Sequence, residues 1–244
     1  MKSNIYTRAL IAILLSSTIW LFSCEKTEKN VPPLITSEVS VLFKTYTVFD
    51  TNSYWVYQNM QNQLTDSISI TDFYTERRFH SPINQNPGFY YNAYEILFQS
   101  GEIGLIRGEV TGGYSTDFKD SLPENYRIYF DNGRYFSILT PQYPLGEEQL
   151  LGINEGNYTN EAFHSTYELN GNTFTNVFQV RVKDYQQAPD TVLMRFFMAK
   201  NVGLIRYFRQ SENRTDDWVL SRWDAKPVPE NPKKNPVHKN RVSF

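Results

Sequence analysis

The stretch of sequence that decides the fold is YRIYFDNGRYFSIL, residues 126–139. Aromatic and β-branched residues recur on both sides of Asn132-Gly133 with the spacing that strands show. Asn-Gly readily adopts the two positive φ angles of a type I′ turn, so we predict a β-hairpin that turns at this dipeptide. Asn170-Gly171-Asn172 and Asn201-Val202-Gly203 separate similar runs and predict two further turns.

Similar runs cover most of the chain and predict an all-β protein. Aromatic residues make up 16% of the sequence, which favours strands over helices. Roughly ten short strands with short connections indicate an antiparallel meander that forms a sandwich or a barrel. We expect one helix near Gly146–Leu151. The other predicted strands are Trp55–Tyr57, Ser69–Thr75, Tyr90–Phe98, Phe163–Leu169, Thr173–Val182, Thr191–Ala199, Leu204–Gln210 and Trp218–Trp223.

One tetrapeptide occurs twice, as Gly104-Leu105-Ile106-Arg107 and as Gly203-Leu204-Ile205-Arg206. Each copy follows an aromatic strand and a turn. Two similar halves of the domain would explain the repetition, and coincidence in a strand-rich sequence is the alternative.

The N-terminus has the organisation of a secretory signal. Lys2 and Arg8 precede an uncharged apolar run at residues 9–21, and the sequence becomes polar after Cys24. The apolar run is shorter than the roughly 20 residues that a membrane-spanning helix needs.

Leu21-Phe22-Ser23-Cys24 resembles the lipobox of bacterial lipoproteins, although Phe22 is bulkier than the usual residue. The resemblance implies that Cys24 carries fatty acyl chains such as palmitate, that the signal is removed before it, and that the protein is anchored at the outer membrane. Several acyl chains anchor firmly where one holds marginally. A free cysteine after an ordinary signal is the alternative. Cys24 is the only cysteine, so an internal disulfide is excluded.

These features divide the chain into four parts. We expect a signal peptide at residues 1–23, a lipidated tether at 24–37, a β-rich domain at 38–225 and a disordered Pro- and Lys-rich tail at 226–244. Glu25-Lys26-Thr27-Glu28 is similar to the export tag of surface lipoproteins, with a plain solvated tether as the alternative. The sequence therefore leaves open the periplasmic face and the cell surface.

A C-terminal hairpin carries a second resemblance. Phe196–Arg206 followed by Trp218-Val219-Leu220 is similar to a hairpin of uncharacterised envelope lipoproteins of Bacteroidota, and Trp55-Val56-Tyr57 is similar to an early strand of that group. The resemblance implies an all-β envelope lipoprotein and brings no catalytic residues.

No motif selects an active site. His80, His164 and His238 lack the spacing of metal ligands, and no nucleophile elbow or phosphate-binding loop occurs, so we expect no cofactor and no metal. Asp66, Asp72 and Glu76 are scattered as solvent-facing strand residues would be. The net charge of −2 gives no reason to expect nucleic acid.

Exposed aromatics are the candidate ligand-binding residues. Tyr54-Trp55 and Tyr90-Tyr91 place neighbours on opposite faces of a strand, so one member of each pair faces away from the core. Exposed Tyr and Trp stack on sugar rings or line an apolar cleft. The alternative is packing between neighbouring strands.

Two functions follow as hypotheses. The first is a non-catalytic, lipid-anchored envelope protein that binds a partner or supports envelope structure. The second is a barrel or sandwich lipoprotein that binds glycan or lipid, which a large apolar cavity would favour. An envelope glycoside hydrolase ranks third because it requires two converging carboxylates.

Overall fold

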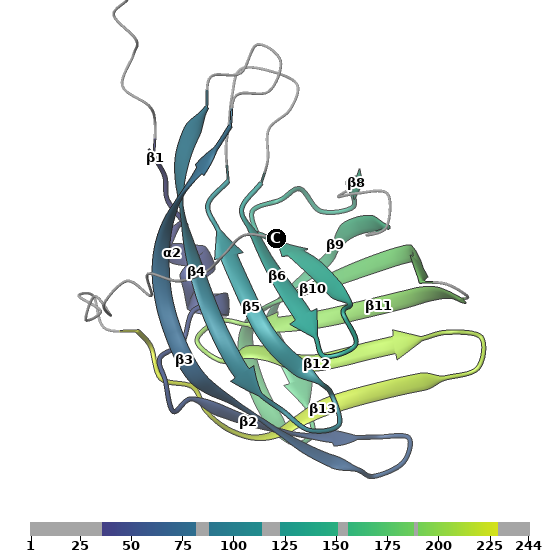
Figure 1. Ribbon diagram of the computed structural model, residues 1–244. Coiled ribbons are helices and arrows are strands. Elements are labelled where there is room, and N and C mark those ends of the chain that lie inside the picture. The colour runs from purple at the N-terminus through teal and green to yellow at the C-terminus, as the bar shows by residue number, and fades with distance from the viewer. Residues whose placement is uncertain (1–35, 82–87, 114–122, 151–155, 188–189, 229–244) are drawn as a thin grey trace, which may run out of the picture. The chain divides into compact units, whose positions relative to one another are not determined.

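The computed structural model describes residues 36–81, 88–113, 123–150, 156–187 and 190–228 (Figure 1). Strands account for 67% of the structure and its one helix among these residues is short, which confirms the all-β prediction. The elements are β1 (Thr36–Ser37), α2 (Val41–Thr47), β2 (Tyr54–Asn59), β3 (Thr65–His80), β4 (Phe89–Gln99), β5 (Leu105–Thr111), β6 (Asn125–Phe130), β7 (Tyr135–Leu139), β8 (Glu148–Leu150), β9 (Asn157–Leu169), β10 (Asn172–Gln187), β11 (Asp190–Ala199), β12 (Gly203–Gln210) and β13 (Thr215–Asp224).

The strands form one sheet in the order β7-β6-β5-β4-β3-β2-β13-β12-β11-β10-β9-β8. Neighbours along this path are antiparallel, as predicted, and the short β1 adds to β4 in the parallel direction. The first and last long strands, β2 and β13, therefore meet in the middle of the sheet. β7 and β8, which come from the middle of the chain, lie at the two ends of the sheet. The sheet is not closed between them.

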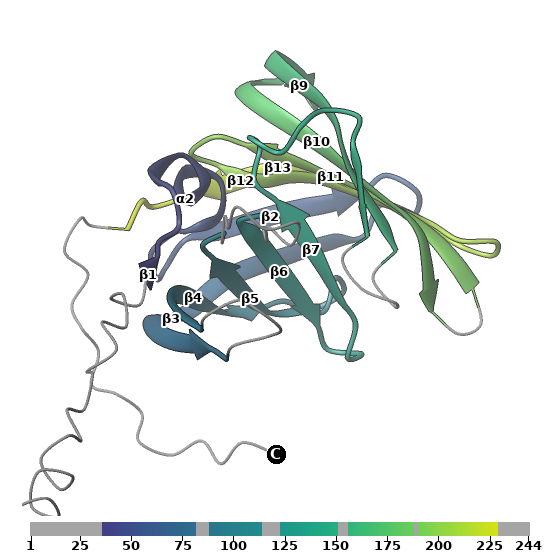
Figure 2. The same cartoon turned by 90° about the horizontal axis from the view of Figure 1, so that it is seen from above.

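The sheet curls so that one half packs on the other across a shared core (Figure 2). Alternate residues of each strand point inward, as the burial of β2 and β6 shows. Rings from the two halves meet there: Phe136 of β7 lies 5.9 Å from Phe196 of β11, and Phe130 of β6 lies 6.1 Å from Tyr207 of β12. The arrangement is a folded-over sheet rather than a closed barrel.

Side chains join the β7 end of the sheet to β9. The hydroxyl of Tyr158 lies 2.6 Å from the backbone nitrogen of Leu139 and accepts its hydrogen bond. Asn160 donates from Nδ2 to the carbonyl oxygens of Thr140 and Tyr143, both at 3.0 Å. Tyr158 and Asn160 are fully buried, so these bonds take the place of strand pairing at this position.

The one helix among the described residues was not predicted. Ser40 caps α2, because its Oγ accepts a hydrogen bond from the nitrogen of Phe43. Phe43 and Tyr46 are buried, and the Tyr46 ring lies 5.0 Å from Phe178 of β10, so α2 packs into the curl of the sheet. The helix expected near Gly146–Leu151 is wrong for the described part of that range, which contains β8 instead.

The three predicted turns connect strands, but the type I′ geometry predicted at Asn132-Gly133 is wrong. At Asn132-Gly133 only Gly133 has a positive φ, +78°, and the backbone nitrogen of Gly133 donates to the carbonyl of Phe130. This geometry fits a type I turn followed by a left-handed glycine. The predicted pair of positive φ angles occurs at Asn170-Gly171, with φ of 51° and 76°.

The repeated tetrapeptide begins β5 and β12 with similar local geometry. Gly104 and Gly203 both have positive φ, 71° and 90°, and a register shift follows each of them. Leu105 and Leu204 line the same small interior cavity. Arg107 and Arg206 each form ion pairs with carboxylates. The isoleucines differ: Ile205 is buried and Ile106 is exposed.

The folded part includes residues at both edges of the expected domain. β1 occupies Thr36–Ser37, the last two residues of the expected tether at 24–37. It pairs with Tyr90 and Tyr91 of β4. On the other side, Pro227 forms a bridge with Phe49. Among the described residues, no helix has the length and apolar character that crossing a membrane requires.

Candidate functional site on the outer face of the sheet

The structure places Tyr54 and Trp55 on opposite faces of β2. Trp55 is 5% exposed, and its indole Nε1 donates to the carbonyl of Val202 over 2.6 Å. Tyr54 is half-buried, and the guanidinium of Arg222 lies 5.9 Å from its ring centre. Trp55 is therefore a core residue, and Tyr54 is available on the outer face.

Tyr90 and Tyr91 lie on β4 beside β1. The Tyr90 ring lies 4.1 Å from the Arg77 guanidinium and 5.0 Å from the Phe79 ring. The Tyr91 ring lies 6.1 Å from that of Phe89. Both tyrosines are half-buried. Because β3 separates β4 from β2, the four candidate aromatics do not form a single site.

Two of the three histidines lie within the described residues. His80 stacks on Phe89 at 5.0 Å, and the ring of His164 lies 5.2 Å from that of Tyr167. In the ranges that the structure describes, His, Asp and Glu side chains form no group of three that would hold a metal ion. His238 and Cys24 lie outside the described residues, so the expected lipidation site stays a prediction.

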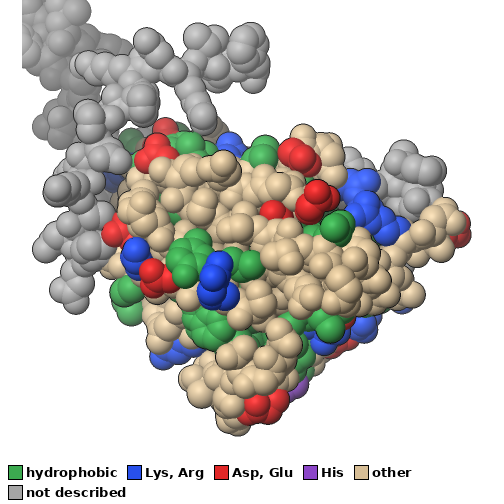
Figure 3. All heavy atoms as spheres, turned by 90° about the horizontal axis from the view of Figure 1, so that it is seen from below, with side chains coloured by type: hydrophobic (Ala, Val, Ile, Leu, Met, Phe, Trp, Pro, Cys, Tyr) green, Lys and Arg blue, Asp and Glu red, His purple; other side chains and the backbone are tan. Residues whose placement is uncertain are grey.

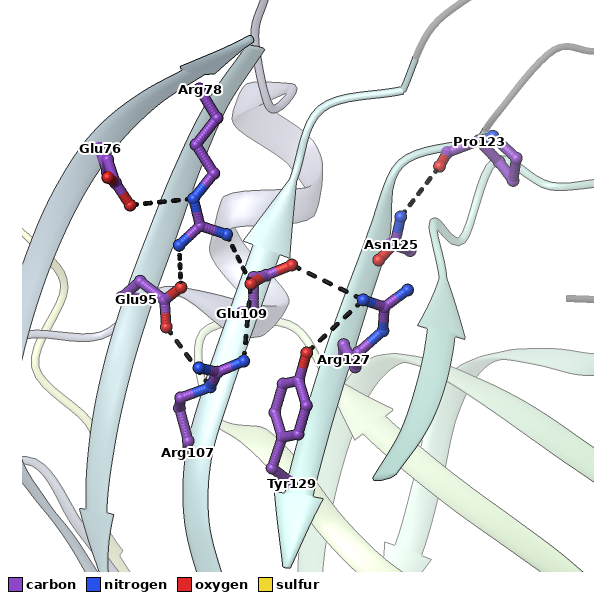
Figure 4. A network of polar contacts seen from close by, with 9 residues as sticks. All are labelled: Glu76, Arg78, Glu95, Arg107, Glu109, Pro123, Asn125, Arg127 and Tyr129. Atoms are coloured by element: carbon purple, nitrogen blue, oxygen red, sulfur yellow. Dashed lines mark hydrogen bonds and ion pairs between the residues drawn. The ribbon is translucent and has the colours of Figure 1, made fainter. Parts of the chain in front are cut away.

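Arginine and glutamate side chains form a network on the outer face of β3–β6 (Figure 4). Arg78 of β3 extends between Glu95 of β4 and Glu109 of β5, which are direct register partners. Its Nη1 lies 2.7 Å from Glu109, and its Nη2 forms an ion pair with Glu95. Arg107 approaches the same two carboxylates at 3.6 and 3.7 Å.

The aromatic rings of β6 and β7 extend this network. The guanidinium of Arg107 lies 3.9 Å from the Tyr129 ring centre, and that of Arg127 lies 5.3 Å from the Tyr135 ring centre. Arg127 also lies 3.9 Å from Glu109. We name the set of Arg78, Glu95, Arg107, Glu109 and Arg127 the arginine–glutamate network.

The pKa values of the two glutamates shift in opposite directions, because their charged partners offset burial to different extents. Burial raises the pKa of Glu95, whose side chain is 0% exposed, and the hydrogen bond from Arg78 only partly offsets this effect. Burial also acts on Glu109, but the hydrogen bond and charge of Arg78 outweigh it and lower the pKa of Glu109. Three hydrogen-bonded carboxylates raise the pKa of Arg78 in spite of its burial.

Split carboxylate pKa values are common in active sites, but this geometry does not favour hydrolysis. A glycoside hydrolase leaves space for a sugar between its two carboxylates. Here the Arg78 guanidinium occupies the space between Glu95 and Glu109. The network therefore acts as a cross-link between β3, β4 and β5.

A second outer-face cluster surrounds a hollow on β10–β12. The hollow has a volume of about 250 Å³ and is lined by Gln179, Arg195, Phe197, Arg206 and Phe208. We name it the outer hollow. Arg206 forms two parallel hydrogen bonds of 2.8 Å to the carboxylate of Asp217, a bidentate pair.

The interior offers far less space. The cavity between the two halves of the sheet has a volume of about 40 Å³, little more than one water molecule occupies in the liquid. Its lining is largely apolar and includes Tyr46 of α2, so the helix helps to fill the core. On the face drawn in Figure 3, hydrophobic side chains form small areas separated by polar and charged ones.

Comparisons with protein-family models, with curated proteins and with solved structures gave no match for this chain. The candidate site therefore depends on geometry alone.

Sequence reasoning missed both outer-face clusters. Glu95 and Glu109 are 14 positions apart, and Arg195 and Phe208 are 13 apart, so only strand register brings each pair together. One signal was present: the repeated Arg107 and Arg206 both belong to these clusters.

Proposed function

We propose that this protein is a lipid-anchored, non-catalytic component of the bacterial cell envelope that binds its ligand or partner on the outer face of its sheet. The anchor would be Cys24, on the strength of the lipobox resemblance, and the location would be the outer membrane.

The binding part of the proposal rests on the difference in volume between the interior cavity and the outer hollow. The interior cavity measures about 40 Å³, whereas the outer hollow measures about 250 Å³. A protein that carries lipid or glycan inside its fold needs a cavity of several hundred Å³. The core residues Phe43, Tyr46 and Phe178 occupy that space here.

The same observation argues against the alternative of a barrel with an interior ligand. The hydrolase hypothesis lacks support because Arg78 and Arg107 already pair with Glu95 and Glu109. These ion pairs favour a structural role for the carboxylates.

Anchoring and the place of binding are tested separately. The full chain, made in a bacterium with an outer membrane and fed an alkyne-labelled palmitate, should carry the label, and the Cys24→Ala variant should not. An unlabelled native protein would overturn the anchoring proposal.

The place of binding is tested with a fluorescent fatty acid and the purified full chain in detergent. We expect no saturable binding to the native chain. Saturable binding that is lost when Met198 or Leu204, which line the interior cavity, is changed to Trp would place the ligand inside and overturn the proposal.

A further inference from the structure

The outer hollow is formed by two adjacent rows of side chains on the outer face of β10–β12. Gln179, Phe197 and Arg206 are direct register partners and form one row, and Arg195 and Phe208 form the next. The residues between them in sequence point inward: Val180 and Phe196 are fully buried in the core. The register therefore directs all five lining residues to the outer face. Four of them are partly exposed, whereas Phe197 is only 5% exposed and lies 5.4 Å from the ring of Tyr167.

Arginine and phenylalanine alternate in both directions across this patch. Arg195 precedes Phe197 by two residues on β11 and pairs with Phe208 of β12, while Phe197 pairs with Arg206. The Arg206 guanidinium lies 5.3 Å from the Phe197 ring centre. The Phe197 ring therefore has a guanidinium beside it. The lining residues include two cations, and each pairs with an acid outside the lining, Arg195 with Glu161 and Arg206 with Asp217.

The polar side chains that line the outer hollow differ in how many of their donor and acceptor atoms already form hydrogen bonds. Arg206 is engaged by Asp217 through Nε and Nη2. Arg195 uses only Nε, at 3.0 Å from Glu161, and among the described residues no acceptor bonds to its Nη atoms. Gln179 donates from Nε2 to Glu161, which leaves its Oε1 as an acceptor.

Comparison with the first copy of the repeat indicates which charge a ligand of the outer hollow would carry. Glu95 and Glu109 stand opposite each other on β4 and β5, two residues from the Leu97–Arg107 pair. Arg195 and Phe208 stand in the same relation to the Phe197–Arg206 pair on β11 and β12. The two acids enclose the cationic Arg78, whereas in the second copy Arg195 pairs with Glu161 through Nε alone and its Nη atoms face an open hollow.

We propose that the outer hollow binds a sugar ring that bears a carboxylate, such as a hexuronic acid residue. The carboxylate would accept hydrogen bonds from the Nη atoms of Arg195, and the partly exposed Phe208 would contact the apolar face of the ring. A ring hydroxyl would donate to Oε1 of Gln179. The hollow, at about 250 Å³, is slightly smaller than typical small-molecule pockets, which suits a ligand of a single ring.

This inference rests on the proposed binding function and names its ligand class. The test is calorimetric titration of the purified full chain in detergent with four probes: glucuronate, its methyl ester, glucose and benzoate. We expect saturable binding of glucuronate. We expect the ester, glucose and benzoate to bind at least roughly tenfold more weakly, because each lacks the charge or the hydroxyls.

Variants assign the binding to the outer hollow. Arg195→Gln should weaken glucuronate binding by roughly ten- to a hundredfold, because it removes a charge-assisted contact. Arg222→Gln is the matched control: Arg222 is an exposed arginine of β13 outside the hollow, and its loss should leave affinity unchanged. Phe208→Leu keeps an apolar side chain and serves as a second variant if Arg195→Gln does not fold.

Three results would overturn the inference: no saturable glucuronate binding, equal binding of benzoate, or full affinity in both variants. None of them bears on acylation of Cys24 or on interior binding, which the earlier experiments address. Failure of the ligand assignment is therefore distinguishable from failure of the proposed function.

Discussion

Replacing Arg78 with methionine tests the arginine–glutamate network as a source of stability. Methionine keeps the apolar stem but removes the ion pairs to Glu76, Glu95 and Glu109. The Glu95 side chain is 0% exposed, and loss of one partner from a buried pair costs about 3–5 kcal/mol.

Two arginines remain close to the glutamates, so the lower end of this range applies. Arg107 stays 3.6 Å from Glu95, and Arg127 stays 3.9 Å from Glu109. We therefore expect a loss of about 3 kcal/mol at neutral pH. With an m-value of about 2 kcal/mol/M, the urea midpoint should fall by about 1.5 M.

The pH dependence gives a second readout with a defined sign. Burial already raises the pKa of Glu95, and loss of Arg78 removes a hydrogen bond that opposes the shift. The folded variant then binds a proton more tightly than the unfolded chain, so its stability rises as pH falls from the raised pKa toward the ordinary glutamate value. In the native protein, the lowered pKa of Glu109 contributes stability that is lost as pH falls through the folded value.

The difference between native and variant should therefore shrink on acidification. Urea unfolding followed by tryptophan fluorescence at a series of pH values measures it, and Arg222→Met is the matched control for loss of an exposed arginine. A midpoint shift below about 0.3 M that does not vary with pH would refute the network as a stabilising cross-link.

Three further substitutions test the hairpin, the sheet end and the anchor. Gly133→Val should lower the free energy of unfolding by about 1–2 kcal/mol in thermal or urea unfolding, because a β-branched residue is strained at a φ of +78°. No heavy atom lies within 4 Å of an added Cβ, so the loss comes from the backbone and not from a clash. Gly133→Asn should cost less, and equal stability of the two variants would contradict the turn geometry. Tyr158→Phe should cost about 1–3 kcal/mol in urea unfolding because the buried nitrogen of Leu139 loses its acceptor; an unchanged midpoint would show that this bond does not hold β7 to β9. Cys24→Ala should move the protein from the membrane to the soluble fraction without changing its unfolding curve, and retention in the membrane would count against lipid anchoring.

Local pattern predicted the strands well and the turns less well. Alternation at 126–139 is a property of consecutive residues, and the structure has β6 and β7 there. The turn at Asn132-Gly133 differs because Asp131 joins the connection and only Gly133 takes a positive φ. The α2 helix escaped prediction because seven residues show too little periodicity, although Ser40 is a recognisable N-cap.

Long-range pairing was not predictable in this way. Nothing local to Trp55 or Trp223 indicates that these residues are register partners across β2 and β13. The same limit applies to Glu95 and Glu109, whose proximity depends on the register of β4 and β5. Trp55 was predicted as a candidate ligand contact from its aromatic character, but its indole nitrogen bonds to Val202 inside the fold.

The meeting of β2 with β13 in the middle of the sheet sets the order in which the strands can pair during synthesis. A chain that emerges from its N-terminus can build β2–β7 as a local meander, but β2 stays an unpaired edge until β13 arrives. That edge carries Tyr54, Trp55 and Tyr57, a composition that invites pairing with other chains. The newly made chain is therefore most exposed to aggregation in the interval before β13 is available to cover β2.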